Sequence, residues 1–182
     1  TYKDQSNNWL NPDEIFQDEN KKYFKKENPK EEVIVGNSES MSKSKKNTID
    51  PENIIENFGA DAVRLFILSD SPPEKDVQWS DQGMLASFKF IQKLSDLHEK
   101  ISSKILNNEK ADCDKELAKF TSQFINKVTD NLEKFHYNVI IANLHEMFNF
   151  LSKHIKKPIN ASELKEHYEK IIYIHLLADL KK

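Results

Sequence analysis

The sequence contains only three glycines in 182 residues, and this scarcity excludes several kinds of nucleotide site. Gly36, Gly59 and Gly83 lie more than twenty residues apart, so they form neither a G-x-G-x-x-G dinucleotide fingerprint nor a Walker-type phosphate loop. The single cysteine, Cys113, excludes a disulfide framework and a cysteine-based zinc site, and it is typical of a reducing compartment. We therefore expect a cytoplasmic protein.

Long apolar runs are also lacking. No stretch approaches the ~18 consecutive apolar residues that span a bilayer, and the first residues lack the pattern of a signal peptide, so no membrane partner is expected. With 37% hydrophobic residues and a net charge of -3, the composition indicates a globular chain of one moderate or two small domains. Because the sequence opens at Thr1 without an initiator methionine, we expect a segment of a longer protein.

The first fifty residues are polar and carry few signs of regular structure. An apolar alternation over residues 32–36 predicts a short strand that ends at a glycine, and residues 2 and 9–10 indicate another. The sequence pattern changes from irregular to helical at Asp50. Aspartate is a preferred N-cap and a proline follows it, so a helix is predicted over residues 51–58. Gly59 is expected to end that helix in the left-handed conformation, before a second, largely buried helix over residues 62–68.

Apolar side chains then recur at helical spacing through the rest of the chain. They predict four amphipathic helices, which begin at residue 81, cover 115–135 and 138–155, and begin again at residue 162. Short polar connections between such helices are typical of an antiparallel bundle. The predicted fold is thus mainly α, with a helical bundle, a short two-helix module before it, and a small irregular or β part at the beginning.

The most distinctive stretch is S-M-S-K-S-K-K-N at residues 40–47, which we call the signature loop. It lies between a predicted strand and a capped helix. Lys43, Lys45 and Lys46 alternate with hydroxyl groups, and a loop of this kind can bring ammonium and hydroxyl donors to phosphate oxygens near the positive end of a helix dipole. A solvated Lys/Ser loop is the alternative, because such stretches are common.

Several strings, in the right order, resemble the class I leucyl-tRNA synthetases. Residues 40–44 resemble the K-M-S-K-S signature of that class. The strings G-A-D-A-V-R-L-F-I-L at residues 59–68 and S-P-P-E-K-D-V-Q-W-S-D-Q-G at residues 71–83 are similar to the leucyl enzyme in particular. Residues 127–130 and 138–146 resemble its K-x-T-x-D and F-N-T-A-I-A-x-x-M-E-L patterns.

The resemblance implies a parent protein that is a ligase, joining leucine to tRNA(Leu) with ATP and Mg²⁺. It implies that Lys43 is catalytic and stabilises the ATP triphosphate, and that Met41, Ser42 and Ser44 complete the phosphate-binding loop. Ser40 departs from the pattern, because the family has a lysine there. The residues predicted to contact RNA are Lys45, Lys46, Lys89, Lys93 and Lys127, and no metal ligand is predicted.

The resemblance also divides the chain into three parts. These are the end of a catalytic domain with the signature loop (1–47), stem-contact helices and a connection (48–80), and an anticodon-binding helical bundle (81–182). No histidine lies in an H-I-G-H-type string, and neither a leucine pocket nor an editing domain is recognisable. We therefore expect ATP and leucine to bind through a missing catalytic half, and the piece alone to be an inactive monomer without a tightly bound cofactor.

Two alternatives stay open from the residues. One is a fragment of another class I synthetase, such as the methionyl or isoleucyl enzyme, because without a pocket the amino acid cannot be read from chemistry. The other is a non-catalytic helical interaction module in which the S-M-S-K-S string is accidental. We expect Arg64 to contact a buried carboxylate such as Asp61, or a backbone carbonyl, rather than RNA. We expect Trp79 to pack against the bundle rather than on a base.

Overall fold

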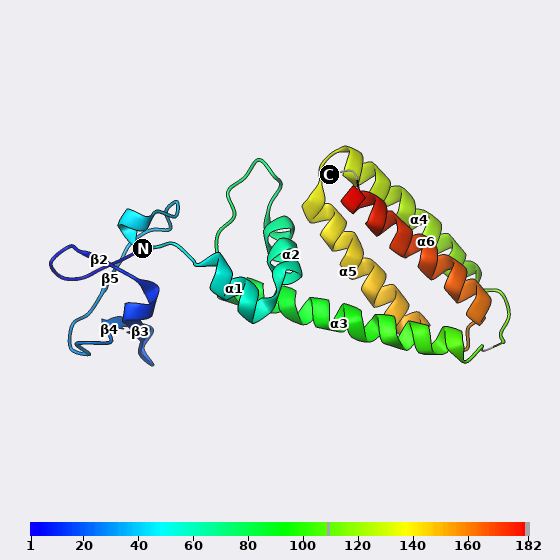
Figure 1. The fold of residues 1–182 in the computed structure, drawn as a ribbon, viewed down its shortest axis with the longest axis horizontal. Coiled ribbons are helices and arrows are strands. Elements are labelled where there is room, and N and C mark those ends of the chain that lie inside the picture. The colour runs from blue at the N-terminus through cyan, green and yellow to red at the C-terminus, as the bar shows by residue number, and fades with distance from the viewer. Residues whose placement is uncertain (109, 181–182) are drawn as a thin grey trace. The chain divides into compact units, whose positions relative to one another are not determined.

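Figure 1 shows a computed structural model of the chain, which describes residues 1–108 and 110–180, without the side chains of residues 174–180. The described residues form two compact units. We call Thr1–Asn57 the N-terminal unit and Phe58–Lys182 the helical unit. The fold is mostly helical with small sheets, as the sequence predicts.

The N-terminal unit is built from two small antiparallel sheets. Strands β1 (Tyr2–Lys3), β2 (Trp9–Leu10) and β5 (Ile34–Val35) form one sheet in the order β2-β1-β5, and β3 (Ile15–Gln17) pairs with β4 (Tyr23–Lys25) in the other. The 3-10 helices η1 (Pro12–Glu14) and η2 (Lys43–Lys45) complete the unit, together with helix α1 (Pro51–Phe58), whose last residue falls in the helical unit.

A small apolar cluster holds this unit together. Leu10, Ile15 and Val33 are buried, and Tyr2 and Tyr23 pack on them. The centroids of the two tyrosine rings lie 5.3 Å apart. The predicted strands at residues 2 and 9–10 are confirmed, whereas the one predicted over residues 32–36 is shorter and exposes its two strand residues.

Five further helices form the helical unit. They are α2 (Ala60–Asp70), α3 (Asp81–Leu106), α4 (Lys115–Glu133), α5 (Tyr137–His154) and α6 (Ala161–Leu180). In Figure 1, α4 packs against both α5 and α6, while α3 crosses them and carries α2 near its start. The predicted helices are confirmed to within a few residues at their ends. No described helix is long and apolar enough to cross a membrane.

The helix starts follow from polar caps. The hydroxyl of Ser80 accepts a hydrogen bond from the Gly83 amide at 3.1 Å at the start of α3, and Asn160 Oδ1 accepts from two backbone amides at the start of α6. Such side chains satisfy amides that have no partner within the helix. Asp50 likewise accepts from the Glu52 amide at 3.1 Å, as its predicted N-cap role requires.

Gly59 differs from the prediction. Its φ is positive, at +79°, but its ψ is 152°, so the backbone is extended rather than left-handed helical. The residue is the N-cap of α2 and does not form a left-handed cap at the end of α1. This region of φ and ψ is essentially open to glycine alone. Glycine is therefore required at this position for a different conformation from the one expected.

The core of the helical unit draws on every helix from α2 to α6. Ile101, Leu117, Leu151, Leu164 and Ile171 are each at most 1% exposed. The second helix is less buried than predicted, because Ile67 is half exposed while Ala62, Leu65 and Phe66 are covered.

Helix α2 lies close to the start of α3. A Cβ on Gly83 would come within 2.7 Å of the Phe66 ring, so the absence of a side chain there permits the close approach. The Trp79 ring meets the same Phe66 ring edge-on at 5.3 Å, so Trp79 packs on α2, whereas the prediction placed it against the bundle.

Candidate nucleotide-binding loop and lysine-bearing helices

The signature loop, residues 40–47, is shaped by one amide side chain. Asn47 Oδ1 accepts a hydrogen bond from the Ser42 amide at 2.7 Å, and Asn47 Nδ2 donates to the carbonyl of Ser40 at 3.3 Å. The hydroxyls of Ser42 and Ser44 lie 2.8 Å apart and share a hydrogen bond. Asn47 thus joins the two ends of the loop, a role that the sequence reasoning did not assign.

The backbone of the loop makes a single tight turn at the three lysines. The Lys45 amide donates to the Ser42 carbonyl at 3.1 Å, and the Lys46 amide donates to the Lys43 carbonyl at 3.2 Å. Lys46 adopts the left-handed conformation, with φ 50° and ψ 30°, at the end of η2.

The three lysines of the loop have different environments. Lys45 forms an ion pair with Glu39, and the pKa of the Glu39 carboxyl is lowered by this hydrogen bond and charge. Lys46 lies 3.6 Å from Glu14, whose pKa is lowered mainly by the Asn11 amide and further by Lys46. Within the described part of the chain, the exposed Lys43 has neither an ion pair nor a hydrogen bond from its ammonium group. Lys43 is therefore the loop cation most available to an anionic ligand.

The predicted RNA-contacting lysines of the helical unit lie on two helices. Lys89 and Lys93 are exposed on α3, whereas Lys127 of α4 binds Glu146 of α5 at 2.8 Å. Lys93 lies near enough to His145 to help lower its pKa, after the larger effect of partial burial. Lys93 and Lys127 thus lie near His145 and Glu146, two consecutive residues of α5, but Lys127 is already paired with the Glu146 carboxylate.

Arg64 has the predicted partner, but the pair is exposed rather than buried. Its Nη1 lies 2.7 Å from Asp61 Oδ1, so the predicted partner is correct. Both side chains are more than two-thirds exposed, at 71% and 76%, so the carboxylate is not buried. Exposed pairs of this kind contribute little to stability.

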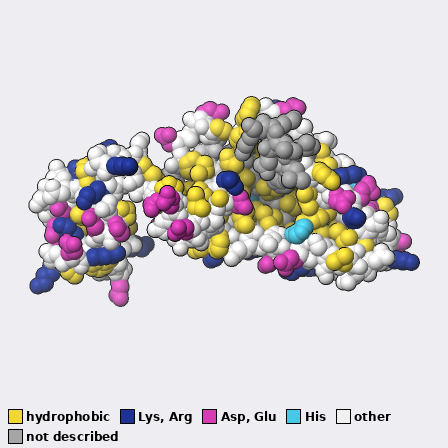
Figure 2. All heavy atoms as spheres, viewed as in Figure 1, with side chains coloured by type: hydrophobic (Ala, Val, Ile, Leu, Met, Phe, Trp, Pro, Cys, Tyr) yellow, Lys and Arg dark blue, Asp and Glu magenta, His cyan; other side chains and the backbone are white. Residues whose placement is uncertain are grey.

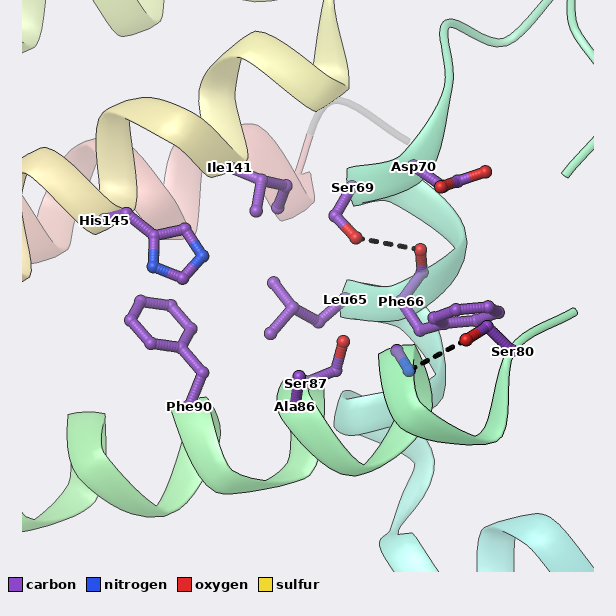
Figure 3. Close-up of a pocket in the computed structure, with 11 residues that line it drawn as sticks. Leu65, Phe66, Ser69, Asp70, Ser80, Ala86, Ser87, Phe90, Ile141 and His145 are labelled. Carbon is purple, nitrogen blue, oxygen red and sulfur yellow. Dashed lines mark hydrogen bonds between the residues drawn. The ribbon is translucent and has the colours of Figure 1, made fainter. Parts of the chain in front are cut away.

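A cavity of about 280 Å³ opens between α2, α3 and α5 (Figure 3). One wall is the Phe90 ring stacked on His145 at a centroid distance of 3.8 Å. The hydroxyl of Ser69 donates to the Phe66 carbonyl, and that of Ser80 accepts from the Gly83 amide. These two hydroxyls are thus engaged in hydrogen bonds to the backbone. No residue of the predicted site lines the cavity, so the cavity is not part of the candidate loop.

The chain is similar to known proteins. Residues 16–80 match the family model described as tRNA synthetases class I (I, L, M and V). The chain is 42% identical over 159 residues to a leucine–tRNA ligase of Rickettsia felis, covering 87% of this chain and 19% of that protein. It is 41% identical over 175 residues to that of Rickettsia bellii, covering 96% of this chain and 20% of that protein.

A solved structure is also similar. It is a LeuRS of Agrobacterium radiobacter in a ternary LeuRS-tRNA-LeuAMS complex, with 25% identity and a TM-score of 0.64, covering 74% of this chain and 18% of that one. The chain therefore spans about a fifth of the length of the curated relatives it matches. The fold and the signature loop define a segment of a class I aminoacyl-tRNA synthetase.

Within that class, the chain is a segment of the leucyl-tRNA synthetase family. Both Rickettsia relatives are leucine–tRNA ligases, so the leucyl family is favoured over the methionyl and isoleucyl alternatives and over the interaction module.

Proposed function

We propose that the parent protein is a leucine–tRNA ligase, which joins leucine to tRNA(Leu) with ATP and Mg²⁺. The observation that carries the proposal is the 42% identity to a leucine–tRNA ligase over 87% of this chain. In this proposal the segment supplies the ATP-stabilising loop and a tRNA-docking bundle, while the binding of leucine and most of the ATP site belong to other parts of the parent.

The signature loop fits the proposed role in ATP binding. Lys43 is the catalytic residue in this proposal, because its unpaired ammonium can reach a phosphate whose negative charge grows as the adenylate forms. Met41, Ser42 and Ser44 form the loop around it, and Asn47 holds the loop closed. Fixed donors stabilise developing charge without a cost of reorganisation.

Mg²⁺ would arrive with the phosphates of ATP. Glu39 and Glu14 are paired with the loop residues Lys45 and Lys46. In this proposal the loop residues contribute cations rather than a magnesium site. Ser40, in place of the family's lysine, leaves this proposed site with one fewer cation.

Residues 81–182 of the helical unit are proposed to be the anticodon-binding bundle, and residues 48–80 before them the stem-contact helices and connection. Residues 81–182 carry 16 basic and 14 acidic side chains, so the overall field is weak and docking must rest on local lysines. Lys89 and Lys93 are the better candidates on α3. Lys127 is already bonded to Glu146, and Lys45 and Lys46 are paired with Glu39 and Glu14, so a phosphate would compete with a carboxylate at these three lysines.

The activity is tested on the full-length parent by leucine-dependent exchange of pyrophosphate into ATP. We expect activity with leucine and none above background with isoleucine or methionine. Substitution Lys43→Ala should lower the rate by about two to three orders of magnitude if Lys43 supports the transition state. Exchange activity of the 182-residue chain alone would refute the division of labour proposed here, since it lacks the remaining site.

The docking role is tested by binding of tRNA(Leu) to the 182-residue chain as a function of salt. We expect affinity to fall steeply with salt, and each contacting lysine that is removed should reduce the log–log slope by about 1. Lys89→Gln and Lys93→Gln should do so. Lys165→Gln, on α6 beside Glu169, is the matched control and should leave the slope unchanged. Affinity that does not change with salt would reject the docking role.

A further inference from the structure

Three side chains with metal-binding donors meet where α4 begins and α5 ends. His154 Nε2 lies 2.5 Å from Asp114 Oδ2 and 4.0 Å from Glu116 Oε2, and one donor atom of each residue lies within 4.8 Å of the other two. The His154 side chain is only 3% exposed, while the side chain of Glu116 is 66% exposed. The cluster is therefore anchored in the core and open to solvent on the Glu116 side.

Contacts outside the cluster hold two of these side chains in place. Asp114 Oδ1 accepts from the amides of Glu116 and Leu117 at 3.0 and 3.1 Å as the cap of α4, which leaves Oδ2 directed at the histidine. The Asp114 amide donates to Glu163 at 2.8 Å. The His154 ring stacks on Phe150 with centroids 4.4 Å apart. Outer contacts of this kind pre-orient metal ligands.

The electrostatics of the two helix ends also suit a cation held by carboxylates. Asp114 and Glu116 lie at the positive end of the α4 dipole, where carboxylates are stabilised in their ionised form, and His154 lies at the negative end of α5. Lys157 approaches Glu116 at 3.6 Å. The carboxylates thus already attract one cation, the Lys157 ammonium, and a bound metal ion would replace it beside Glu116.

We propose that Asp114, Glu116 and His154 bind a divalent transition-metal ion, with Zn²⁺ as the best match. Imidazole nitrogen and carboxylate oxygen are both zinc donors, so these three residues would supply three ligands and a water molecule would complete four-coordination. Ligands bonded at about 2.1 Å in a tetrahedron lie roughly 3.4 Å apart, which is between the shortest and longest donor separations seen here. The Glu116 side chain is exposed and would have to move closer to His154, and the ion would take the place of the hydrogen bond between His154 and Asp114.

Such an ion would tie the start of α4 to the end of α5. These two positions are 40 residues apart in the chain, and the ion would act as a structural cross-link at the end of the bundle. The site is independent of the signature loop and of the proposed ligase activity, so either proposal can fail without the other.

The test is titration of the full 182-residue chain, purified free of metal, with ZnCl₂ by isothermal calorimetry. We expect one equivalent bound and a thermal midpoint that rises with Zn²⁺. Glu116→Gln is the main variant, because its exposed side chain can change without loss of the fold, and it should weaken binding about tenfold or more. His154→Gln should abolish binding, with circular dichroism to confirm that the helices remain.

Two matched controls separate this site from incidental binding. His98→Gln removes an exposed imidazole of α3, and Cys113→Ser removes the exposed thiol next to Asp114, which donates to Glu163 rather than to the cluster. Neither substitution should change the stoichiometry or affinity. Absence of stoichiometric binding, binding by Glu116→Gln equal to that of the unsubstituted chain, or loss of binding in Cys113→Ser would each overturn the proposal.

Discussion

The N-terminal unit and the helical unit are stabilised by different kinds of contact. The first buries only three apolar side chains and relies on polar turns, such as the Asp4 carboxylate, which accepts from the amides of Ser6 and Asn8 at 2.9 and 2.8 Å. Among the side chains that the structure describes, the second buries fifteen apolar residues in one cluster. Because apolar burial is the main favourable term in folding, we expect the helical unit to be the more stable of the two.

The two tryptophans allow this difference to be measured. Trp9 lies in the N-terminal unit, with the Lys3 ammonium 4.1 Å from its ring centroid, and Trp79 lies in the helical unit against Phe66. Substituting each tryptophan in turn by phenylalanine leaves a fluorescence signal from one unit only. In urea, the Trp9 signal should change at a lower concentration than the Trp79 signal.

The largest expected effect comes from the core of the helical unit. Leu151→Ala should lower the free energy of unfolding reported by Trp79 by about 2–5 kcal/mol, because the residue is fully buried and leaves a cavity. The matched change in the other unit, Val33→Ala, should cost about 0.5–3 kcal/mol and act on the Trp9 signal. If Leu151→Ala moved both signals equally, the two units would be unfolding as one.

A helix cap should have a smaller effect. Ser80→Ala removes the acceptor of the Gly83 amide and should cost about 1 kcal/mol, measured by urea unfolding followed by helical circular dichroism. Ser95→Ala, an exposed position within the same helix, is the control and should cost nothing, since alanine favours helix. Equal losses from both substitutions would show that the cap contact is unimportant.

The two units should also respond to different ranges of pH. All six histidines lie in the helical unit. The pKa of His145 is lowered from its ordinary value of 6.5 by partial burial and then by Lys93. The unfolded chain therefore binds more protons near this pH, and the stability of the helical unit should fall as pH drops below about 6.5. His145→Gln should flatten this part of the urea-midpoint profile, and His98→Gln serves as control.

In the N-terminal unit the relevant groups are carboxyls. Hydrogen bonds from Asn8 lower the pKa of Asp4 below its ordinary value of 3.8. The ionised form stabilises the fold, so this contribution is present above about pH 4 and is lost as pH falls through the lowered pKa. The urea midpoint reported by Trp9 should thus stay constant as pH drops below about 6.5, where the midpoint reported by Trp79 begins to fall. A Trp9 transition that follows the histidine range would contradict this separation.

The smallest effect is expected at the exposed pair between α4 and α5. A double-mutant cycle with Lys127→Gln and Glu146→Gln should give a coupling free energy of about 0.2–1 kcal/mol that decreases with salt. A larger, salt-independent coupling would mean that the pair does more than bridge two solvated helices.

Most of the helical unit was predictable because its apolar side chains recur at helical spacing and its caps are ordinary serine, aspartate and asparagine residues. The hairpin of β3 and β4 was missed. Its turn depends on Asp18, whose carboxylate accepts from the Asn20 and Lys22 amides at 2.9 and 2.8 Å, and on Lys21 in the left-handed conformation. No glycine or proline marks this turn, and its turn residues Asp18 and Asn20 do not stand out in a segment that is rich in Asp and Asn throughout.

The candidate loop was found from its string of residues, but its internal geometry was not. Nothing in the spacing shows that Asn47 closes the loop, or that Lys45 and Lys46 pair with carboxylates while Lys43 does not. The roles assigned to these residues in ATP and RNA binding stay predictions, as does the division of the chain at residues 47/48 and 80/81.

The sequence by itself determined the helices, their caps and the family, because periodicity, capping and ordered motifs are local properties of the chain. Only the tertiary structure decided which charges are neutralised and which donors meet. Asp114 and His154 are 40 residues apart, and Lys127 and Glu146 are 19 apart. Such meetings depend on how whole helices pack, and packing is set by the shape of the buried core rather than by the residues it brings together at the surface.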